Sequence, residues 1–259
     1  MGFSGGSAEN RLLQMLRPDD LELMRLALTP WHGKQGETLH EPGDELRFAY
    51  FPCGPSVVSY LVVFEDRRPV ETVLIGNEGM AGGIVSDGAP RAYVRAQVQL
   101  PGPFLRIALD ELEQAKSRSP WLRQLFARYA EYLFASLFQS IACNTVHSIH
   151  QRTAKWLMIA MERAGDRRIP LTQEQLSTMM GVRRSYVSRV LQTFKAKSVV
   201  DTGRAKLIVE DLDRLQGLAC DCGASVRTLY DELLTGAYPP TSAAEAADPP
   251  LAATALETS

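Results

Sequence analysis

The segment from residue 172 to residue 192 constrains the fold more than any other part of this 259-residue chain. Thr172 and Gln175 have the spacing of a capping box, in which each side chain accepts a hydrogen bond from the backbone N–H of the other residue, so a helix is expected to start here. Gly181 ends that helix, because a tight turn needs a residue without a Cβ atom. A second helix is expected from Arg183 to about Lys197. Together these signals predict a helix-turn-helix.

The residue types inside this segment suit two helices that pack against each other. The inward positions are apolar or small: Leu176, Ser177, Met180, Gly181, Val182, Val187 and Val190. The residues left exposed at the front of the second helix are Arg183, Arg184, Ser185, Ser188 and Arg189. Arginine matches the N7 and O6 acceptors of guanine, and serine can contact bases or phosphates. Because such a helix offers its N-terminal residues to base edges in the major groove, we expect it to bind double-stranded DNA.

A small β-hairpin is expected directly after the second helix, with strands at Val199–Asp201 and Lys206–Val209. Arg204 and Lys206 at its tip would lie over DNA phosphates as a wing. We add Thr172, at the start of the first helix, to the expected DNA-binding residues. Small three-helix units also occur in proteins that never touch DNA. A signalling module that acts through protein contacts is therefore an alternative, which the exposed arginines disfavour.

The charge of the chain is concentrated in the same region. Between His150 and Leu207 there are 12 cations against 4 anions, so this stretch carries +8 in a chain whose net charge is −2, and the remainder carries −10. A basic module on an acidic body favours binding of a polyanion at one place only. A solvated charged face is the alternative that charge alone leaves open.

Short apolar or alternating runs separated by glycine and proline turns dominate the chain from Trp31 to about Leu109. This pattern is typical of an antiparallel barrel or sandwich, and it predicts a β-roll of the jelly-roll kind in an α+β protein. One or two short helices are expected before it, from Glu9 to Leu28, with Pro18 restarting the pattern. The strands are expected at Phe48–Phe51, Ser56–Phe64, Val70–Ile75, Ala92–Val98 and Phe104–Leu109.

A long helix is expected after the β-roll, because Ser119 can cap it and Pro120 suits the first helical position. It should run to about Thr145, with apolar residues on more than one stripe. One side can pack on the β-roll and the other needs a partner, although a central core helix of a monomer would show the same pattern. The expected division is a β-roll at 1–118, a long helix at 119–146, a winged helix-turn-helix at 147–235 and a disordered tail at 236–259.

With these parts in this order, the chain resembles the Crp/Fnr family of bacterial transcription regulators over about residues 9 to 234. The stretches that carry the resemblance are Tyr50–Pro52, Ile75–Gly82, Ala142–Ser148, Leu171–Leu191 and Leu207–Asp211. The resemblance implies a homodimer joined through the long helix, a roughly palindromic operator, and a signal sensed by the β-roll. It also implies contact with RNA polymerase if the protein is an activator.

Within the resemblance, the base-reading positions of the family fall on Arg184, Ser185, Ser188 and Arg189. The family often has a glutamate, which accepts from cytosine N4, where this chain has Ser185. The usual half-sites of the family are therefore not expected here. Arg189 is the best single candidate for a guanine contact.

The cyclic-nucleotide site of the family is altered in this chain. Nucleotide-binding members use a glycine-glutamate pair for the ribose and a later arginine for the cyclic phosphate. The matching positions fall on Gly79 and Met80, with Arg91 near the position of the arginine. Met80 cannot accept a hydrogen bond from a ribose hydroxyl, and Glu78 lies one position away. We therefore expect a signal other than cyclic AMP, with Glu78, Gly79, Met80 and Arg91 as the candidate effector residues.

The four cysteines indicate no cofactor on their own. Iron–sulfur members of the family have an N-terminal cysteine cluster, and this chain has only Cys53 before the long helix. Cys220 and Cys222, together with Cys143, could hold a metal or respond to oxidation, but their spacing lacks the C-x₂-C of ordinary zinc sites. Buried thiols are the expected state, and no metal site is predicted.

An enzyme is the alternative from another class, since β-rolls also form metal-dependent cupin enzymes. Those need a clustered H-x-H with a nearby carboxylate. His40-Glu41 and Glu45 have no second histidine at a suitable distance, so catalysis is not expected. The absence of an apolar run of membrane-spanning length predicts a cytoplasmic protein without membrane contacts.

Overall fold

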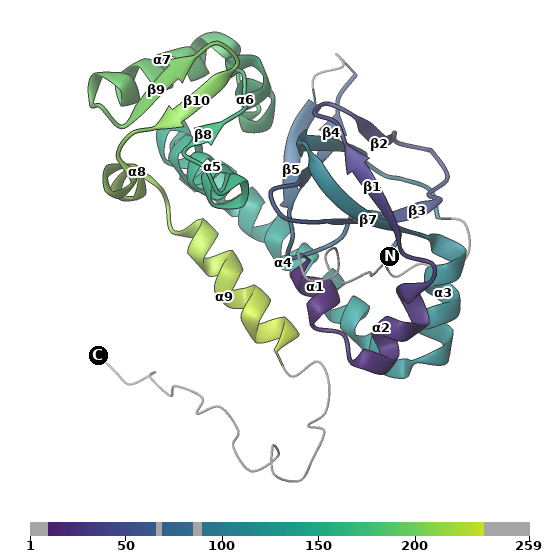
Figure 1. The fold of residues 1–259 in the computed structure, drawn as a ribbon. Coiled ribbons are helices and arrows are strands. Elements are labelled where there is room, and N and C mark those ends of the chain that lie inside the picture. The colour runs from purple at the N-terminus through teal and green to yellow at the C-terminus, as the bar shows by residue number, and fades with distance from the viewer. Residues whose placement is uncertain (1–9, 66–68, 85–89, 236–259) are drawn as a thin grey trace, which may run out of the picture.

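The computed structural model describes residues 10–65, 69–84 and 90–235, and its N-terminal part is a β-roll of two antiparallel sheets (Figure 1). The first sheet has the order β1-β7-β3, formed by Thr29–Gly33, Gly102–Ala108 and Phe48–Pro52. The second has the order β2-β6-β4-β5, formed by Thr38–His40, Arg95–Leu100, Val57–Val63 and Pro69–Ile75. The predicted β-roll is therefore confirmed. β1 and β2 were not predicted as separate strands, because β1 contains proline and glycine and is largely exposed, and β2 has only three residues.

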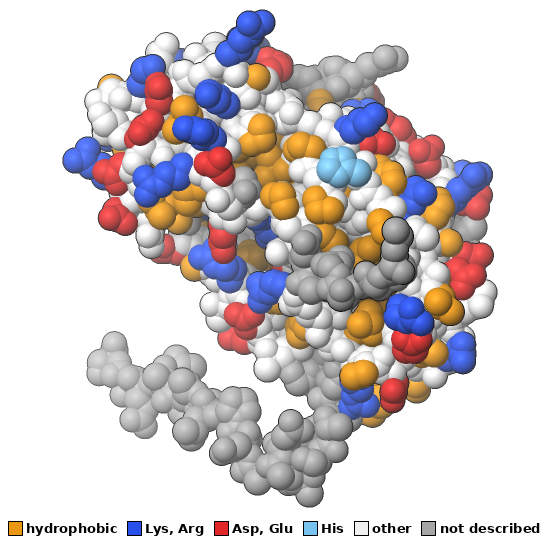
Figure 2. All heavy atoms as spheres, in the orientation of Figure 1, with side chains coloured by type: hydrophobic (Ala, Val, Ile, Leu, Met, Phe, Trp, Pro, Cys, Tyr) orange, Lys and Arg blue, Asp and Glu red, His pale blue; other side chains and the backbone are white. Residues whose placement is uncertain are grey.

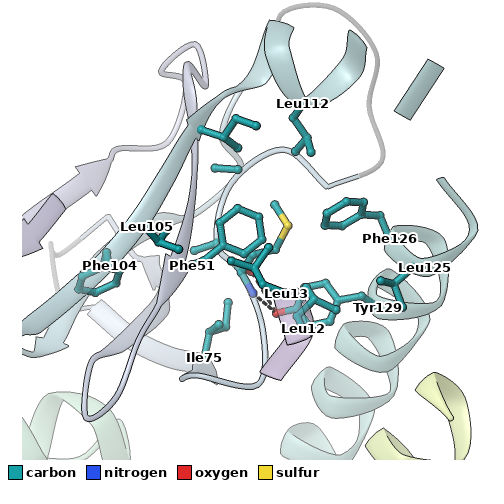
Figure 3. Close-up of a cluster of buried hydrophobic side chains, with 14 of the residues drawn as sticks. Leu12, Leu13, Phe51, Ile75, Phe104, Leu105, Leu112, Leu125, Phe126 and Tyr129 are labelled. Carbon is teal, nitrogen blue, oxygen red and sulfur yellow. Dashed lines mark hydrogen bonds between the residues drawn. The ribbon is translucent and has the colours of Figure 1, made fainter. Parts of the chain in front are cut away.

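Short helices close one end of the β-roll. The predicted helical segment before the roll is two helices, α1 (Arg11–Gln14) and α2 (Pro18–Arg25), and Pro18 starts the second as expected. A further helix that was not predicted, α3 (Leu109–Arg118), follows β7 directly and buries Leu109, Leu112 and Ala115. Side chains from α1, the strands, α3 and α4 meet in one apolar core (Figure 3).

The long helix α4 (Pro120–Val146) begins where the sequence predicts, since the Ser119 hydroxyl accepts a hydrogen bond from the Leu122 N–H at 3.1 Å. Its first half is buried against the β-roll. Tyr129 is fixed there by two hydrogen bonds: its hydroxyl accepts from the Met80 N–H at 2.9 Å and donates to the Met80 carbonyl at 3.0 Å. In its second half, Phe134, Phe138 and Ile141 are exposed.

The C-terminal part is a winged helix-turn-helix with its own apolar core. Its helices are α5 (Ile149–Ala164), α6 (Gln173–Met180), α7 (Arg184–Ala196) and α8 (Leu212–Leu218). Its sheet has the order β8-β10-β9, formed by Arg168–Ile169, Lys206–Val209 and Val200–Gly203. Gly181 has φ +65°, a left-handed conformation that favours glycine, so the predicted turn is confirmed.

A last helix, α9 (Cys222–Leu234), contacts α4 and returns toward the β-roll (Figure 1). It was not predicted as a separate helix. The Tyr230 hydroxyl donates to the Glu78 carbonyl at 2.9 Å, and Tyr230 and Leu234 join the β-roll core. Part of the α4 surface is thus covered by the same chain rather than by a partner. The stripe with Phe134, Phe138 and Ile141 remains open.

The helix-turn-helix packs on the outer face of the second sheet. A Cβ atom at Gly181 would lie 3.1 Å from a Val70 methyl group, and Val57 and Leu100 of the β-roll join the apolar core of the C-terminal part. The Gln35 amide donates to the Pro170 carbonyl at 2.7 Å across the same contact. The two parts of the chain are therefore held together by side chains from both.

Candidate nucleic-acid interface

The first helix of the helix-turn-helix is capped as the sequence predicts. The Thr172 N–H donates to Gln175 Oε1 at 2.9 Å, and the Gln175 N–H donates to Thr172 Oγ1 at 3.1 Å. Ser177, at the helix crossing, is buried and donates to the Glu174 carbonyl at 2.7 Å. This helix is fixed further by Arg152 of α5, which donates to the Met180 carbonyl at 3.0 Å. The sequence did not indicate this role of Arg152, because the contact depends on how α5 and α6 pack.

The second helix, α7, has one buried and one exposed face. Its buried face packs Val187, Val190, Leu191 and Phe194 into the domain core. Arg183, Arg184, Ser185 and Arg189 are exposed, and Ser188 is half-buried. The Arg184 guanidinium lies 3.9 Å from the Glu174 carboxylate with both side chains about two-thirds exposed, so this ion pair is weak and leaves the arginine available.

Tyr186 is an exposed residue of α7 that the sequence did not single out. The Arg189 guanidinium lies over its ring, 5.1 Å from the centroid. A cation above an aromatic face is attracted to it, so Tyr186 orients Arg189 on the exposed surface. The i, i+3 spacing of the two residues on a helix was the available signal.

The hairpin β9–β10 lies beside the start of α6 and α7. Arg204 and Lys206 at its tip are exposed, and Ala205 between them has φ +55°. A cleft of about 370 Å³ separates the hairpin from the two helices, and Thr172, Arg184 and Lys206 all line it. The structure thus brings these three expected residues together at one cleft, while Ser188 and Arg189 lie further along α7. Figure 2 shows several Lys and Arg side chains at this end of the molecule, interspersed with Asp and Glu.

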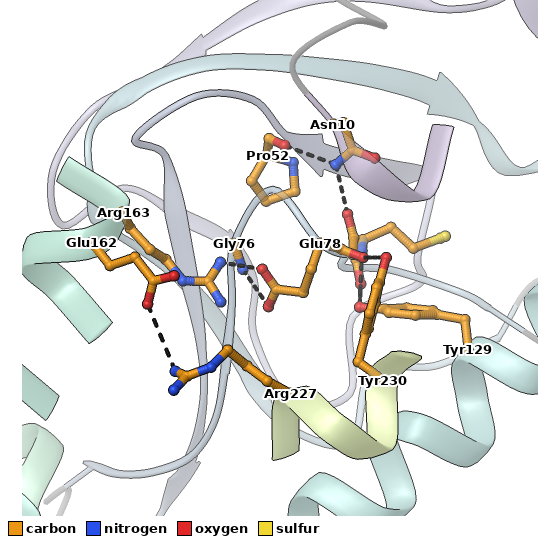
Figure 4. A network of polar contacts seen from close by, with 11 residues as sticks. Asn10, Pro52, Gly76, Glu78, Tyr129, Glu162, Arg163, Arg227 and Tyr230 are labelled. Atoms are coloured by element: carbon orange, nitrogen blue, oxygen red, sulfur yellow. Dashed lines mark hydrogen bonds and ion pairs between the residues drawn. The ribbon is translucent and has the colours of Figure 1, made fainter. Parts of the chain in front are cut away.

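The four candidate effector residues lie in contacts within the chain, and Figure 4 shows those around Glu78. Met80 is fully buried, and a Cβ atom at Gly79 would collide with the Tyr129 hydroxyl at 2.0 Å. The Glu78 carboxylate is bound by Arg163 of α5 and by the Gly76 N–H. Arg91 instead donates to the Gly43 carbonyl at 3.0 Å, and it does not line the cavity beside Glu78. Within the described residues, Glu78 and Arg91 therefore do not line a common ligand pocket.

The ionisation of Glu78 follows from its partner. Burial by itself would raise the pKa of this carboxyl group, but the charge and hydrogen bond of Arg163, together with backbone hydrogen bonds from Gly76 and Glu78, hold the pKa below its ordinary value. The ion pair lies beside a cavity of about 420 Å³ between the β-roll and helices α4, α5 and α9. Arg152, Lys155 and Arg227 line this cavity as well, together with Glu71.

A family model described as a Crp-like helix-turn-helix domain matches residues 151–218. No curated protein matches the chain. No helix within the described residues is long and apolar enough to cross a membrane.

Solved structures share the fold at low sequence identity. One is a putative Crp/Fnr regulator from Eubacterium rectale, with 19% identity, coverage of 80% of this chain and 96% of that chain, and a TM-score of 0.59. Another is FixK2 from Bradyrhizobium japonicum, with 17% identity, 74% and 98% coverage, and a TM-score of 0.61. A third is the c-di-GMP-responsive regulator CLP from Xanthomonas campestris, with 14% identity, 75% and 100% coverage, and a TM-score of 0.61. The chain therefore carries a Crp-like helix-turn-helix domain at residues 151–218 within the overall fold of the Crp/Fnr transcription regulators.

Proposed function

We propose that this protein regulates transcription by binding a palindromic DNA site as a homodimer. The observation that carries the proposal is the exposed front of α7: Arg184, Ser185 and Arg189 are exposed, and Arg184 also lines the cleft beside the hairpin β9–β10. Arg184, Ser185, Ser188 and Arg189 would read base edges in the major groove. Thr172, Arg183, Arg204 and Lys206 would contact phosphates, which position the protein without reading sequence.

The open stripe on α4 supports the homodimer. Phe134, Phe138 and Ile141 have 60%, 70% and 62% of their surface exposed, which is unusual for such large apolar side chains on one helix. Exposed residues on this helix are separated alternately by four and three positions, as in a coiled-coil seam: Ala127, Glu131, Phe134, Phe138, Ile141 and Thr145. The same stripe on a second copy would be self-complementary around a two-fold axis. Such a dimer presents two copies of α7 to the two halves of a palindrome.

The β-roll would supply the signal. Cyclic AMP is not the expected ligand, since Met80 is buried and the Glu78 carboxylate is bound by Arg163. The cavity of about 420 Å³ beside this ion pair has walls from both the β-roll and the DNA-binding domain. A ligand there would favour one relative placement of the two parts over others and so shift the separation of the two α7 helices. The protein would have no catalytic role in this function, and it would contact RNA polymerase only as an activator.

Selection of bound sequences from random DNA tests this function. The purified chain would be used in reducing buffer at one fixed salt concentration, with and without cyclic AMP, because DNA affinity depends steeply on salt. We expect a palindromic motif in both conditions. A variant with Arg184→Ala and Arg189→Ala would serve as control and should enrich no motif. A motif without two-fold symmetry would contradict the dimer, and enrichment only with cyclic AMP would contradict the proposed signal.

A further inference from the structure

Three of the four cysteines meet one histidine at the junction of α4, α5 and α9. Cys143 and His147 lie one helical turn apart at the end of α4, while Cys220 and Cys222 flank the start of α9. One ligand atom from each of these four residues lies within 4.8 Å of all the others. The three cysteines are buried. Residues from positions 143 to 222 thus converge on one point, which the short C-x-C spacing alone did not reveal.

The distances between the donor atoms match a tetrahedral metal site. Zinc binds thiolate sulfur at about 2.3 Å and histidine nitrogen at about 2.0–2.1 Å, so a tetrahedron places two sulfurs about 3.8 Å apart and a sulfur and a nitrogen about 3.6 Å apart. Cys143 Sγ lies 3.7 Å from Cys220 Sγ, and Cys222 Sγ lies 3.4 Å from His147 Nδ1. Both pairs have the separation of two vertices of such a site.

The surroundings also suit a site rich in sulfur. The Lys155 ammonium group of α5 lies 3.2 Å from Cys143 Sγ and donates a hydrogen bond to it. Three thiolates and one divalent ion leave a net charge of −1, which this cation offsets. Sulfur and imidazole ligands favour zinc over calcium or magnesium, which prefer oxygen.

We propose that Cys143, His147, Cys220 and Cys222 bind one zinc ion in a structural Cys₃His site. Binding converts three thiols to thiolates, releases their three protons to the solvent, and uses the neutral imidazole of His147. His147 caps α4, and only Ser148 separates it from α5. The ion would therefore tie α9 to the connection between the long helix and the DNA-binding domain.

Metal analysis of the purified 259-residue chain tests this site. The reduced protein would be stripped with chelator, incubated with excess Zn²⁺ and desalted, and we expect one zinc per chain. Replacement by Co²⁺ should give the d–d bands of a tetrahedral ion and thiolate charge-transfer bands. Cys220→Ser should weaken zinc binding at least about 10-fold, because loss of a ligand costs no less than loss of an outer-shell partner. Cys53→Ser is the matched control, since Cys53 is a buried cysteine of the β-roll core, and it should retain one zinc.

A second variant separates loss of a ligand from loss of the fold. Cys222→His retains four donors, so it should still bind one Co²⁺ with weaker thiolate charge-transfer bands. Zinc should raise the melting temperature of the original chain and of Cys53→Ser but not of Cys220→Ser. No retained zinc in the reduced original chain would overturn the proposal. Equal losses in Cys53→Ser and Cys220→Ser, or binding of iron with sulfide in place of zinc, would also overturn it.

Discussion

The Arg163 guanidinium of α5 forms an ion pair with the Glu78 carboxylate, which lies in the loop after β5. Both side chains are largely buried, and the Gly76 N–H donates to the same carboxylate at 3.1 Å. The adjacent Glu78 carbonyl accepts from Tyr230 of α9. One residue of the β-roll therefore links to both the DNA-binding domain and the last helix, so the placement of that domain depends on this loop.

Arg163→Met should destabilise the chain by about 3–5 kcal/mol, because it leaves the Glu78 carboxylate buried without its cation. The double variant with Glu78→Gln should recover part of this loss. Urea unfolding of the original chain, both single variants and the double variant gives the coupling free energy. Arg227→Met is the control: its ion pair with Glu162 is exposed and 3.7 Å long, so its loss should cost at most about 1 kcal/mol. If the double variant loses as much stability as the two single variants added together, the two side chains do not interact.

Glu71 should make stability dependent on pH. Burial raises the pKa of this carboxyl group from 4.5 to about 7, although hydrogen bonds from Ser59 and Trp156 and the charge of Lys155 act in the opposite direction. Below pH 4.5 the group is protonated in both the folded and unfolded chain. Between about pH 4.5 and pH 7 the carboxyl group ionises in the unfolded chain but stays largely protonated in the folded chain, so stability falls as the pH rises and levels off above about 7.

Glu71→Gln copies the protonated state and should remove this pH-dependent loss of stability. We expect the loss to be roughly 1–3 kcal/mol. The free energy of unfolding would be measured at pH 5, 6, 7 and 8. The difference between the variant and the original chain should grow in favour of the variant from pH 5 to pH 8. Glu162→Gln, which replaces an exposed carboxylate on the same cavity, is the control. A constant difference across this range would show that Glu71 does not titrate there.

The helix-turn-helix was predictable because its signals are local. The capping box at Thr172, the left-handed Gly181 and the apolar positions of α7 all act within a few residues, and the structure has each of them. The cap at Ser119 is of the same kind. These helix ends and this turn are therefore determined by neighbouring residues rather than by distant parts of the chain.

The contacts that were not predictable join residues far apart in sequence. Glu78 and Arg163 are 85 positions apart, and Cys143 and Cys220 are 77 apart. Neither residue of a pair carries a local signal for the other, and α9 has the composition of an ordinary amphipathic helix with no sign of what it covers. Such contacts depend on how whole helices and strands pack against one another. That packing cannot be inferred from a single sequence.

Arg189→Ala should lower discrimination between the selected motif and random DNA by about 1–3 kcal/mol per half-site, because a base contact carries sequence information. Arg204→Ala is the matched comparison, since this exposed residue at the hairpin tip would contact phosphates only. It should weaken binding to both DNAs by the same factor and reduce the salt dependence of binding. Equal losses on both DNAs for Arg189→Ala would refute its assignment to a base.

Phe138→Asp should dissociate the proposed dimer. Burial of one large apolar side chain contributes about 1.5–3 kcal/mol, and a two-fold seam loses this contribution twice and gains two charges in an apolar contact. We expect the dissociation constant of the dimer to rise at least about 100-fold. This corresponds to a loss of about 2.7 kcal/mol or more in the free energy of association. Sedimentation equilibrium over a range of protein concentrations measures it.

Tyr93→Asp is the control for this variant, because Tyr93 is an aromatic residue outside α4, just before β6, with 92% of its surface exposed. It should leave the dimer unchanged, and both variants should keep the helix content of the original chain by circular dichroism. Phe138→Asp should also bind a single half-site with the affinity of the original chain while losing the added affinity for the full palindrome. If Phe138→Asp remains a dimer at every concentration, the two copies associate through a surface other than the exposed stripe of α4.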